Sequence, residues 1–396
     1  MKSISKDIFK KYQAQTFPYP SLLEVEIAEG SYITDVDGKK YLDFVAGVSS
    51  CSIGHSNMNV INAVKDQIDK YSHVMVYGEY IQKPQYTLAK LLAENLPEKL
   101  STTYFTNSGT EAIEGAVKLA KRINGRSEII SCKNSYHGST HGSLSLMGNE
   151  QYKAQYRPLL PDCNQIIYND IKSLEQISEK TSAVIIESIQ GASGFIIASK
   201  DFLKKLNSIC KKNKVLIIFD EIQTCFGRTG TLFGFEQTPI IPDIICIAKG
   251  MGGGMPIGAF ISSWKNMNEL TYNPKLGHIT TFGGHPINCA ASKATLEFIL
   301  EKKIITEIEK KEKLFRKHLQ HKKIKKITGK GLMISIDLYD DHHTNQLVEN
   351  CMSDGLLLFY FLFNTKSVRI TPPLTISLRE IEMGCSIILK NLNKLN

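Results

Sequence analysis

The stretch D-I-I-C-I-A-K-G-M-G-G-G-M-P-I-G (243–258) decides the fold of this chain, together with V-L-I-I-F-D-E-I-Q (215–223). In each stretch, an apolar run of strand length ends in one ionisable residue, Lys249 or Asp220, and glycine or polar residues follow. Functional residues cluster where parallel strands end. The two stretches therefore predict neighbouring buried strands that deliver a lysine and an aspartate to one site.

Strand and helix patterns alternate on both sides of this pair. Strands are expected at 103–106, 128–131, 182–187, 215–220, 243–248 and 258–262, and helices at 111–122 and 200–212. This rhythm predicts an α/β fold with a mostly parallel, doubly wound sheet flanked by helices. The ligand is expected at the carboxyl ends of its strands.

The pattern changes beyond about Ala291, to a long charged helix and then short strands at 332–338, 356–363 and 367–370. We expect a smaller α+β domain here, built from both termini. The predicted organisation is an N-terminal segment 1–50 that contributes to the small domain, a large domain 51–290 and a C-terminal small domain 291–396.

Length and composition are typical of a soluble enzyme: the chain has 396 residues, of which 42% are hydrophobic and 22% charged. The N-terminus lacks the apolar core of a secretory signal, and the longest apolar run, 356–363, is too short to span a bilayer. The nine cysteines are odd in number and show no C-x-x-C spacing, which favours a reducing cytoplasm.

The formal net charge of +9 raises the alternative of a nucleic-acid-binding protein. Much of the excess lies in 301–330, where apolar residues recur at helical spacing. The lysines are therefore expected on the outer face of an amphipathic helix. Because no aromatic stacking platform accompanies them, we interpret this region as a solvated helix face.

The segment T-N-S-G-T-E-A (106–112) opens a helix directly after a strand. Its small residues let the backbone approach an anion, and the unpaired N–H groups of a first helical turn bind phosphate. The same segment is also an ordinary helix N-cap. With Lys249 and Asp220 downstream, we expect it to bind a phosphate group.

These features match the chemistry of pyridoxal phosphate. That cofactor needs an amine to form a Schiff base with its aldehyde, and a carboxylate to keep its pyridine nitrogen protonated. It also needs a site for its phosphate.

Six motifs now identify a resemblance that covers nearly the whole chain. They are N-S-G-T-E-A, S-Y-H-G, E-x-I-Q-G, F-D-E-I-Q-x-x-F-G-R-T-G, A-K-G-M-G-G-G-M-P-I-G and T-F-G-G-H-P. In this order, they resemble the class III aminotransferases, the fold-type-I pyridoxal phosphate enzymes that include acetylornithine, ornithine and 4-aminobutyrate aminotransferases.

The resemblance implies a large domain with a sheet of the seven-stranded type, and a homodimer with shared active sites. It implies ping-pong transfer of an amino group from an amino acid or ω-amino donor to a 2-oxo acid. An amino-acid racemase or epimerase of the same fold is the alternative, because it would use the same lysine and aspartate to reprotonate Cα.

The resemblance also assigns site residues. Lys249 would form the Schiff base and shuttle a proton, while Asp220 would pair with the pyridinium nitrogen. The other implied cofactor contacts are Ser108, Gly109 and Thr110 at the phosphate, Tyr136 on the ring face, Gln223 near the phenolic oxygen, His137, Glu187, and Thr281 at the neighbouring subunit's phosphate.

The chain departs from the family pattern in the substrate pocket. Ser139 stands where many relatives carry arginine, and Ala192 replaces a glutamate that masks a second arginine. That second arginine is kept as Arg369, and Val48 replaces a tyrosine of ornithine-type relatives. One carboxylate receptor remains, which predicts weaker discrimination for 2-oxoglutarate and tolerance of donors with an uncharged distal end.

Three further patterns are interpreted as structural. His137 and His141 have the spacing of metal ligands on a helix, but Gly138 and Gly142 make a helix improbable, so we expect no metal. The run 340–343 is interpreted as a solvated loop. Cys225 lacks an identifiable basic partner and is interpreted as a packed residue rather than a nucleophile.

Overall fold

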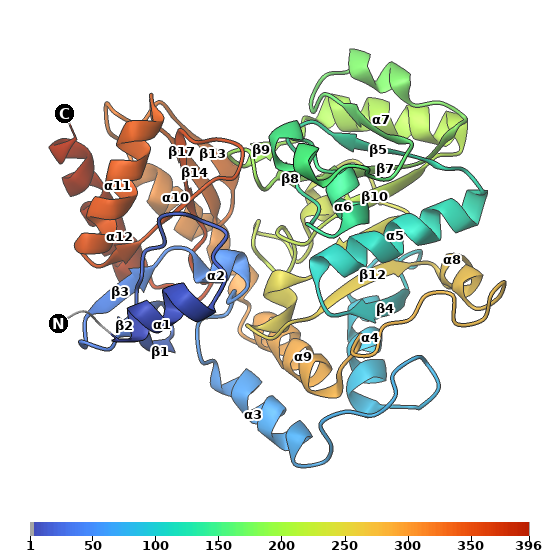
Figure 1. Ribbon diagram of the computed structural model, residues 1–396, viewed down its shortest axis with the longest axis horizontal. Helices are drawn as coiled ribbons and strands as arrows, with labels where there is room; N and C mark the ends of the chain where they lie inside the picture. The colour runs from blue at the N-terminus through green and yellow to red at the C-terminus, as the bar shows by residue number, and fades with distance from the viewer. Residues whose placement is uncertain (1–3, 396) are drawn as a thin grey trace.

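The computed structural model describes residues 4–395, which form two lobes (Figure 1). The larger lobe is built on a seven-stranded sheet. Its order across the sheet is β4 (Thr102–Thr106), β12 (Gly258–Ser262), β11 (Ile244–Ile247), β10 (Leu216–Asp220), β7 (Thr181–Glu187), β5 (Glu128–Cys132) and β6 (Cys163–Ile166). The pairings in this sheet are parallel except for the two that β12 makes. The predicted mostly parallel sheet is confirmed.

The central strands contain uninterrupted apolar runs because both faces of the sheet are covered. In β10, Ile217 and Phe219 belong to one buried cluster and Ile218 to another. Alternate residues of a strand point to opposite faces, so a strand buried on both sides needs a continuous apolar run. This is why the strand predictions agree with the observed ends within one or two residues.

Helices lie on both faces of the sheet, as predicted. One face packs against α5 (Gly109–Asn124). The other large-lobe helices are α3 (Met58–Ile68), α4 (Lys83–Glu94), α6 (His141–Ser145), α7 (Lys200–Asn213), α8 (Trp264–Met267) and α9 (Pro286–Glu301). Each helix that the sequence predicted here exists, with α5 beginning two residues earlier and ending two residues later than expected.

The smaller lobe contains two four-stranded sheets and three long helices. One sheet has the order β13 (Lys326–Lys330), β14 (Met333–Asp337), β17 (Ser367–Ile370) and β16 (Phe359–Tyr360). The helices are α10 (Ile308–His318), α11 (Asp341–Ser353) and α12 (Leu378–Lys394).

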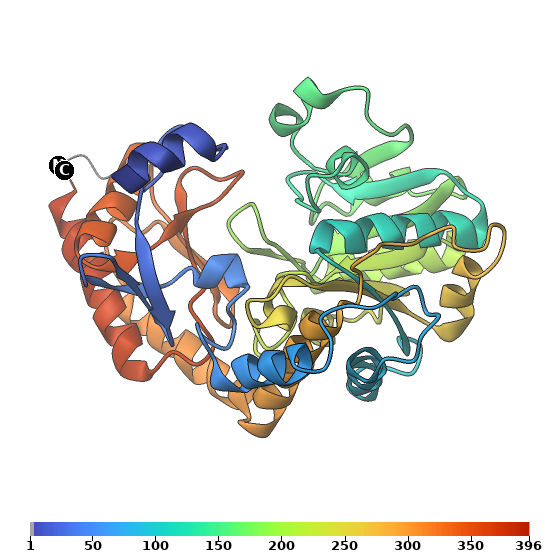
Figure 2. The same cartoon turned by 60° about the horizontal axis from the view of Figure 1, so that its bottom comes forward.

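Both ends of the chain contribute to this lobe. The second sheet has the order β1 (Val25–Glu29), β2 (Tyr32–Asp35), β3 (Lys40–Asp43) and β15 (Leu356–Leu357), so β3 pairs with a strand from the far end of the sequence. Leu42 and Phe44 lie in the same buried cluster as α12 residues. Figure 2 shows the N-terminal helix α1 (Ile4–Tyr12) on this lobe.

The prediction of one strand over 356–363 is wrong. The segment forms two short strands, β15 and β16, which belong to different sheets. The chain therefore passes from one sheet to the other within this apolar run, and hydrophobicity alone could not reveal the change.

The basic region also differs from its prediction. Helix α9 ends at Glu301, and α10 begins at Ile308 after a short 3₁₀ turn, so there is no single long helix. Most of its lysines are exposed, but Lys311 is buried and its Nζ donates a hydrogen bond to Leu374 O at 2.6 Å. That lysine is part of the packing rather than of a solvated face.

No helix in the described part of the chain is long and apolar enough to cross a membrane. All nine cysteines are free, and seven of them are buried.

Candidate active site

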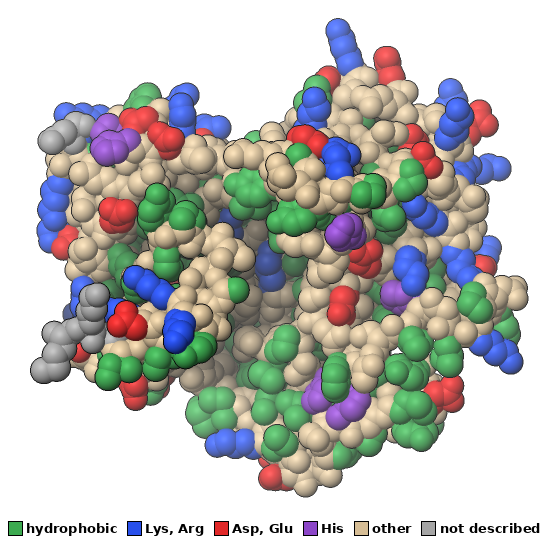
Figure 3. All heavy atoms as spheres, in the orientation of Figure 1, with side chains coloured by type: hydrophobic (Ala, Val, Ile, Leu, Met, Phe, Trp, Pro, Cys, Tyr) green, Lys and Arg blue, Asp and Glu red, His purple; other side chains and the backbone are tan. Residues whose placement is uncertain are grey.

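A cleft of about 1260 Å³ separates the two lobes, and Figure 3 shows it as a deep hollow in the centre of the molecule. We call the side formed by the ends of the large-lobe strands and the start of α5 the inner wall, and the side formed by the small lobe, together with Val48, Ser139 and Ala192, the outer wall. The predicted site residues that line it are Val48, Ser108, Gly109, Thr110, Tyr136, His137, Ser139, Glu187, Ala192, Asp220, Gln223, Lys249 and Arg369. Of the predicted site residues, only Thr281 is missing from this set.

Three neighbouring strands bring ionisable groups to the inner wall. Asp220 ends β10, and the register of the parallel sheet sets it opposite Glu187 at the end of β7. Lys249 follows β11, the neighbour of β10 on the other side, and has a left-handed backbone with φ of 48°. The predicted convergence of lysine and aspartate is therefore present.

The environment of Lys249 favours its neutral form. Burial lowers the pKa of its amine, and the positive charge of Arg369 lowers it further, against the opposing charges of Asp220 and Glu187. A lower pKa leaves more of the amine unprotonated at neutral pH, and the unprotonated amine is the nucleophile.

Asp220 is held from two directions. Its Oδ2 lies 2.7 Å from His137 Nδ1, and its Oδ1 accepts a hydrogen bond from Ile222 N at 3.0 Å. Burial lowers the pKa of His137, but the hydrogen bond and charge of Asp220 outweigh burial and raise it. The raised pKa keeps a proton on the imidazole of His137 over a wider pH range, so that the ring can donate its hydrogen bond to the Asp220 carboxylate.

Glu187 is a second buried carboxyl group at this edge of the sheet. Its Oε1 accepts a hydrogen bond from Gly191 N at 2.7 Å, whereas its Oε2 is buried without a partner. Burial raises the pKa of Glu187 to about 7. A buried oxygen without a hydrogen-bond partner costs folding free energy, and a bound ligand could supply the partner that Oε2 lacks.

The N-terminus of α5 faces the cleft. Ser108 is its N-cap, with Oγ accepting from Glu111 N at 3.3 Å. A side chain at Gly109 would lie 2.8 Å from Ile222 Cδ1, so the small residue at this position is required for packing. The first intrahelical hydrogen bond runs from Ala112 N to Ser108 O, and Glu111 N is bound by the cap, so the N–H groups of Gly109 and Thr110 are the ones available to an anion.

These residues fit pyridoxal phosphate. The inner wall offers an amine of lowered pKa, a carboxylate held by a histidine, and a helix N-terminus for a phosphate. Gln223 lies beside them and donates from Nε2 to Ser49 Oγ at 3.2 Å. Tyr136 lines the same wall, with its hydroxyl 3.1 Å from Ser139 Oγ.

The outer wall begins with an unusual turn. Residues 46–49 all have positive φ, between 49° and 71°, which is a strained conformation for Val48 because its side chain is β-branched. Asp43 anchors the turn by accepting hydrogen bonds from two of its backbone N–H groups, at 2.7 and 3.0 Å. Asp43 in turn lies 2.8 Å from His55 Nε2 and raises the pKa of that histidine to about 10.

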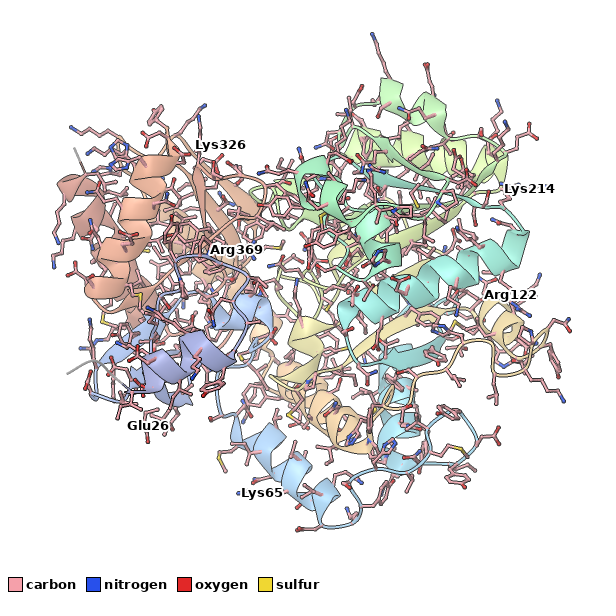
Figure 4. All side chains as sticks on the ribbon, viewed as in Figure 1. Glu26, Lys65, Arg122, Lys214, Lys326 and Arg369 are labelled. Carbon is pink, nitrogen blue, oxygen red and sulfur yellow. The ribbon has the colours of Figure 1, made fainter. Side chains whose placement is uncertain are left out.

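Arg369 extends from β17 toward the large lobe (Figure 4). Its guanidinium lies over the rings of Phe361 and Phe195, with centroid distances of 4.8 and 5.8 Å. Its one hydrogen bond in the described structure, to Gly191 O, is long at 3.5 Å, and its Nε is buried without a partner. Burial lowers the pKa of Arg369 to about 10. The group is positioned by aromatic faces and keeps free donors for a carboxylate.

Ala192 and Ser139 lie where the sequence placed them, on the cleft surface. Ala192 is buried, and its carbonyl accepts a hydrogen bond from Phe363 N at 3.0 Å. Among the described residues that line the cleft, Arg369 is the only arginine. No carboxylate in the described chain forms a salt bridge with it.

Thr281 lies outside the cleft, in an exposed loop before α9. Its neighbour Phe282 is 53% exposed and packs against His73 at a centroid distance of 4.8 Å. In the view of Figure 3, hydrophobic and histidine side chains gather in the lower part of the molecule.

The rim of the outer wall was missed from the sequence. It is lined mainly by aromatic and apolar residues, namely Phe17, Tyr19, Tyr152, Phe359, Tyr360 and Leu362. Tyr152 reaches across from the large lobe, and its hydroxyl donates to Leu362 O at 2.9 Å. These residues come from three separated segments and share no spacing or motif that could have identified them.

The three patterns interpreted as structural have mixed outcomes. Gly142 does lie in a helix, the short α6, but His137 precedes it and pairs with Asp220. The expected loop at 340–343 is instead the start of α11, because Asp340 Oδ1 caps the helix by accepting from His343 N at 2.8 Å. Cys225 is buried, as expected. The described residues contain no cluster suited to a metal ion.

The sequence of this chain matches the family described as Aminotransferase class-III over residues 14–392. It is 37% identical over 373 residues to an acetylornithine aminotransferase of Clostridium acetobutylicum. The alignment covers 91% of this chain and 93% of that protein.

Solved structures show the same similarity. The ornithine aminotransferase of Toxoplasma gondii superposes with a TM-score of 0.91 at 27% identity, over 98% of this chain and 94% of that one. The omega transaminase of Pseudomonas jessenii, in complex with PMP, gives a TM-score of 0.91 at 25% identity, over 99% and 98% of the two chains.

Proposed function

The chain belongs to the class-III aminotransferases and is a pyridoxal-phosphate-dependent transaminase, and from this premise we propose how its own residues act. When bound, the cofactor supplies an aldehyde that takes up the amino group and a ring that accepts electrons. The comparisons lend no support to a racemase or epimerase.

Lys249 is the proposed nucleophile and proton carrier. Its Nζ would bind the cofactor covalently and, once the amino donor has displaced it, would move a proton between Cα of the substrate and the aldehyde carbon of the cofactor. The observation that carries this proposal is that Asp220 and Lys249 lie at the ends of two adjacent parallel strands, β10 and β11, and line the same cleft. The lowered pKa of Lys249 supports the role, because the amine must be neutral to act.

Asp220 is proposed to hold a proton on the ring nitrogen of the cofactor, with His137 keeping it ionised and oriented. Tyr136 is proposed to lie against the ring, Gln223 and Glu187 at its edge, and Ser108, Gly109 and Thr110 at the phosphate. The helix N-terminus at α5 supports the last assignment.

The proposed substrates are an amino acid or ω-amino donor and a 2-oxo acid, as in the similar acetylornithine aminotransferase. Arg369 would bind a carboxylate with its free donors. With Ser139, Ala192 and Val48 on the other sides, the described lining of the pocket offers no second arginine, so a donor with an uncharged distal end should be accepted.

The proposed assembly is a homodimer in which Thr281 reaches the phosphate in the partner subunit. Two observations support it: Thr281 cannot serve its own cleft, and Phe282 beside it is half exposed. We also retain as proposals the domain limits 1–50, 51–290 and 291–396, and a cytoplasmic location, which the nine free cysteines support. Residues 1–3 and 396 of those domains lie outside the described residues.

A half-reaction screen tests this function. The holoenzyme is mixed with single amino compounds, and absorbance follows conversion of the cofactor to its pyridoxamine form. N-acylated and ω-amino donors are expected to convert it, and a 2-oxo acid should reverse the change. Failure of every amino donor, with correctly loaded cofactor, would contradict the proposal.

A further inference from the structure

Three hydroxyl groups form a closed cluster between the start of α5 and α6. Figure 1 shows these two helices next to each other. Thr110 Oγ1 lies 2.8 Å from Thr140 Oγ1 and 2.7 Å from Ser143 Oγ. Thr140 Oγ1 and Ser143 Oγ are themselves 3.1 Å apart. Each hydroxyl is therefore within hydrogen-bonding distance of the other two.

A carboxylate anchors this cluster from one side. Thr140 Oγ1 donates to Glu114 Oε1 at 2.6 Å, and Ser143 N donates to the same oxygen at 3.0 Å. Glu114 lies one helical turn after Thr110 on α5. It takes part in no salt bridge within the described residues, so its carboxylate serves the hydroxyl groups and not a cation.

Two glycines make the close approach possible. A side chain at Gly138 would overlap Thr110 and Ser143, and a side chain at Gly142 would overlap Glu114. Gly138 also has φ of 134°, which L side chains rarely adopt. The loop is therefore shaped around this cluster.

The donors can be assigned from their chemistry. A carboxylate only accepts hydrogen bonds, so the single proton of Thr140 points to Glu114. Thr140 Oγ1 can therefore only accept from the other two hydroxyl groups. Thr110 Oγ1 accepts from Thr140 N at 3.4 Å and can also accept from Ser143, whose hydroxyl has Thr140 O at 3.1 Å as its other acceptor. The proton of Thr110 then has two acceptors within reach, Thr140 Oγ1 and a phosphate oxygen in the cleft that Thr110 lines.

We propose that Glu114, Thr140 and Ser143 are positioning residues that hold the Thr110 hydroxyl as a hydrogen-bond donor to the phosphate of the cofactor. The inference rests on the phosphate-binding role proposed for Thr110. It adds a second layer of residues that act on the phosphate through Thr110, without touching the cofactor.

The test compares pyridoxal phosphate with pyridoxal, which lacks the phosphate, by measuring both dissociation constants on the full-length apoprotein. Thr110→Val should raise the constant for pyridoxal phosphate about ten- to a hundredfold, the typical value of a hydrogen bond to a charged group, and leave that for pyridoxal unchanged. Glu114→Ala should raise it about three- to tenfold, again without affecting pyridoxal.

Conservative variants separate positioning from folding. Glu114→Gln should keep most of the affinity, because its amide oxygen can still accept from Thr140 and Ser143. Ser143→Ala should weaken phosphate-dependent binding, whereas the matched control Ser145→Ala should not. Ser145 is on the same short helix, but its hydroxyl donates to His141 O and does not contact the cluster.

A double-mutant cycle decides the outcome. If Glu114 acts through Thr110, Glu114→Ala should have no further effect in the Thr110→Val protein. An unchanged affinity in Thr110→Val would overturn the phosphate role of Thr110 and this inference with it. A different result would overturn this inference and leave the phosphate role of Thr110 intact. In that result, Thr110→Val weakens the binding of pyridoxal phosphate, but Glu114→Ala and Ser143→Ala weaken the binding of pyridoxal and pyridoxal phosphate equally.

Discussion

The inner and outer walls of the cleft are held in different ways. On the inner wall, Asp220 is fixed by two hydrogen bonds of 2.7 and 3.0 Å at the end of a buried strand. On the outer wall, Arg369 has one hydrogen bond of 3.5 Å and otherwise lies against aromatic rings. Short, complete hydrogen bonding fixes a geometry, whereas ring faces and free donors leave room for different ligands. We therefore expect the inner wall to fix the chemistry and the outer wall to select the substrates.

The largest effect is expected on the inner wall. Lys249→Ala should abolish turnover, because no other amine in the described part of the cleft can replace Nζ. The phosphate and ring contacts should still retain some cofactor, which dialysis and absorbance would measure. Borohydride reduction of the native protein followed by peptide mass spectrometry should place the cofactor on Lys249. Attachment to a different lysine would show that the assignment is wrong.

The corresponding change on the outer wall should affect binding and spare the chemistry. Arg369→Ala should raise KM for the 2-oxo acid about ten- to a hundredfold, because a buried charge-assisted hydrogen-bond pair is lost. The rate constant at saturating acceptor should change much less. Steady-state kinetics with varied acceptor measure both values, and a fall in kcat at constant KM would contradict the separation of the walls.

The partner subunit is expected to add one hydrogen bond to the phosphate of the cofactor at the inner wall. Thr281→Val should weaken cofactor retention several-fold, about the effect of one lost hydrogen bond, without changing the thermal unfolding of the apoprotein. Equilibrium dialysis measures retention, and Thr271→Val, at an exposed threonine outside the cleft lining, is the control. A fully active monomer, seen by sedimentation and assay at the same low concentration, would disprove the shared site.

The smallest expected effect is electrostatic coupling between the walls. Burial lowers the pKa of Lys249, and the charge of Arg369 contributes to the lowering. Arg369→Met removes that charge, so the pKa of Lys249 should rise and cofactor capture should require higher pH. The pH midpoint of the capture rate, followed by absorbance, should therefore move upward in Arg369→Met and remain in place in Arg369→Lys. An unchanged midpoint in Arg369→Met would show that the two groups are not coupled.

The sequence predicted the inner wall well because strand ends leave local signals. Lys249 and Asp220 each follow an uninterrupted apolar run, and the segment around Ser108 carries both a cap and small residues. Parallel pairing then brings such ends together without further information.

The outer wall could not be predicted in the same way. Tyr152 and Leu362 meet across the cleft from segments 210 residues apart. The left-handed turn that carries Val48 depends on Asp43 and on contacts with the far end of the chain, including the hydrogen bond from Thr371 N to Phe44 O at 2.7 Å. Such features depend on tertiary packing and leave no periodic pattern in the sequence.

The central claim is that the inner wall carries out the chemistry and the outer wall selects the substrate, and the ratio of kcat/KM for pyruvate and 2-oxoglutarate tests it most directly. The ratio is measured in the native enzyme, in Thr110→Val saturated with cofactor, in Arg369→Ala and in Ser139→Arg. We predict a weak preference in the native enzyme and the same ratio in Thr110→Val. Arg369→Ala should alter the ratio, and Ser139→Arg should shift it toward 2-oxoglutarate. A strong native preference for 2-oxoglutarate that Arg369→Ala leaves unchanged would contradict the account.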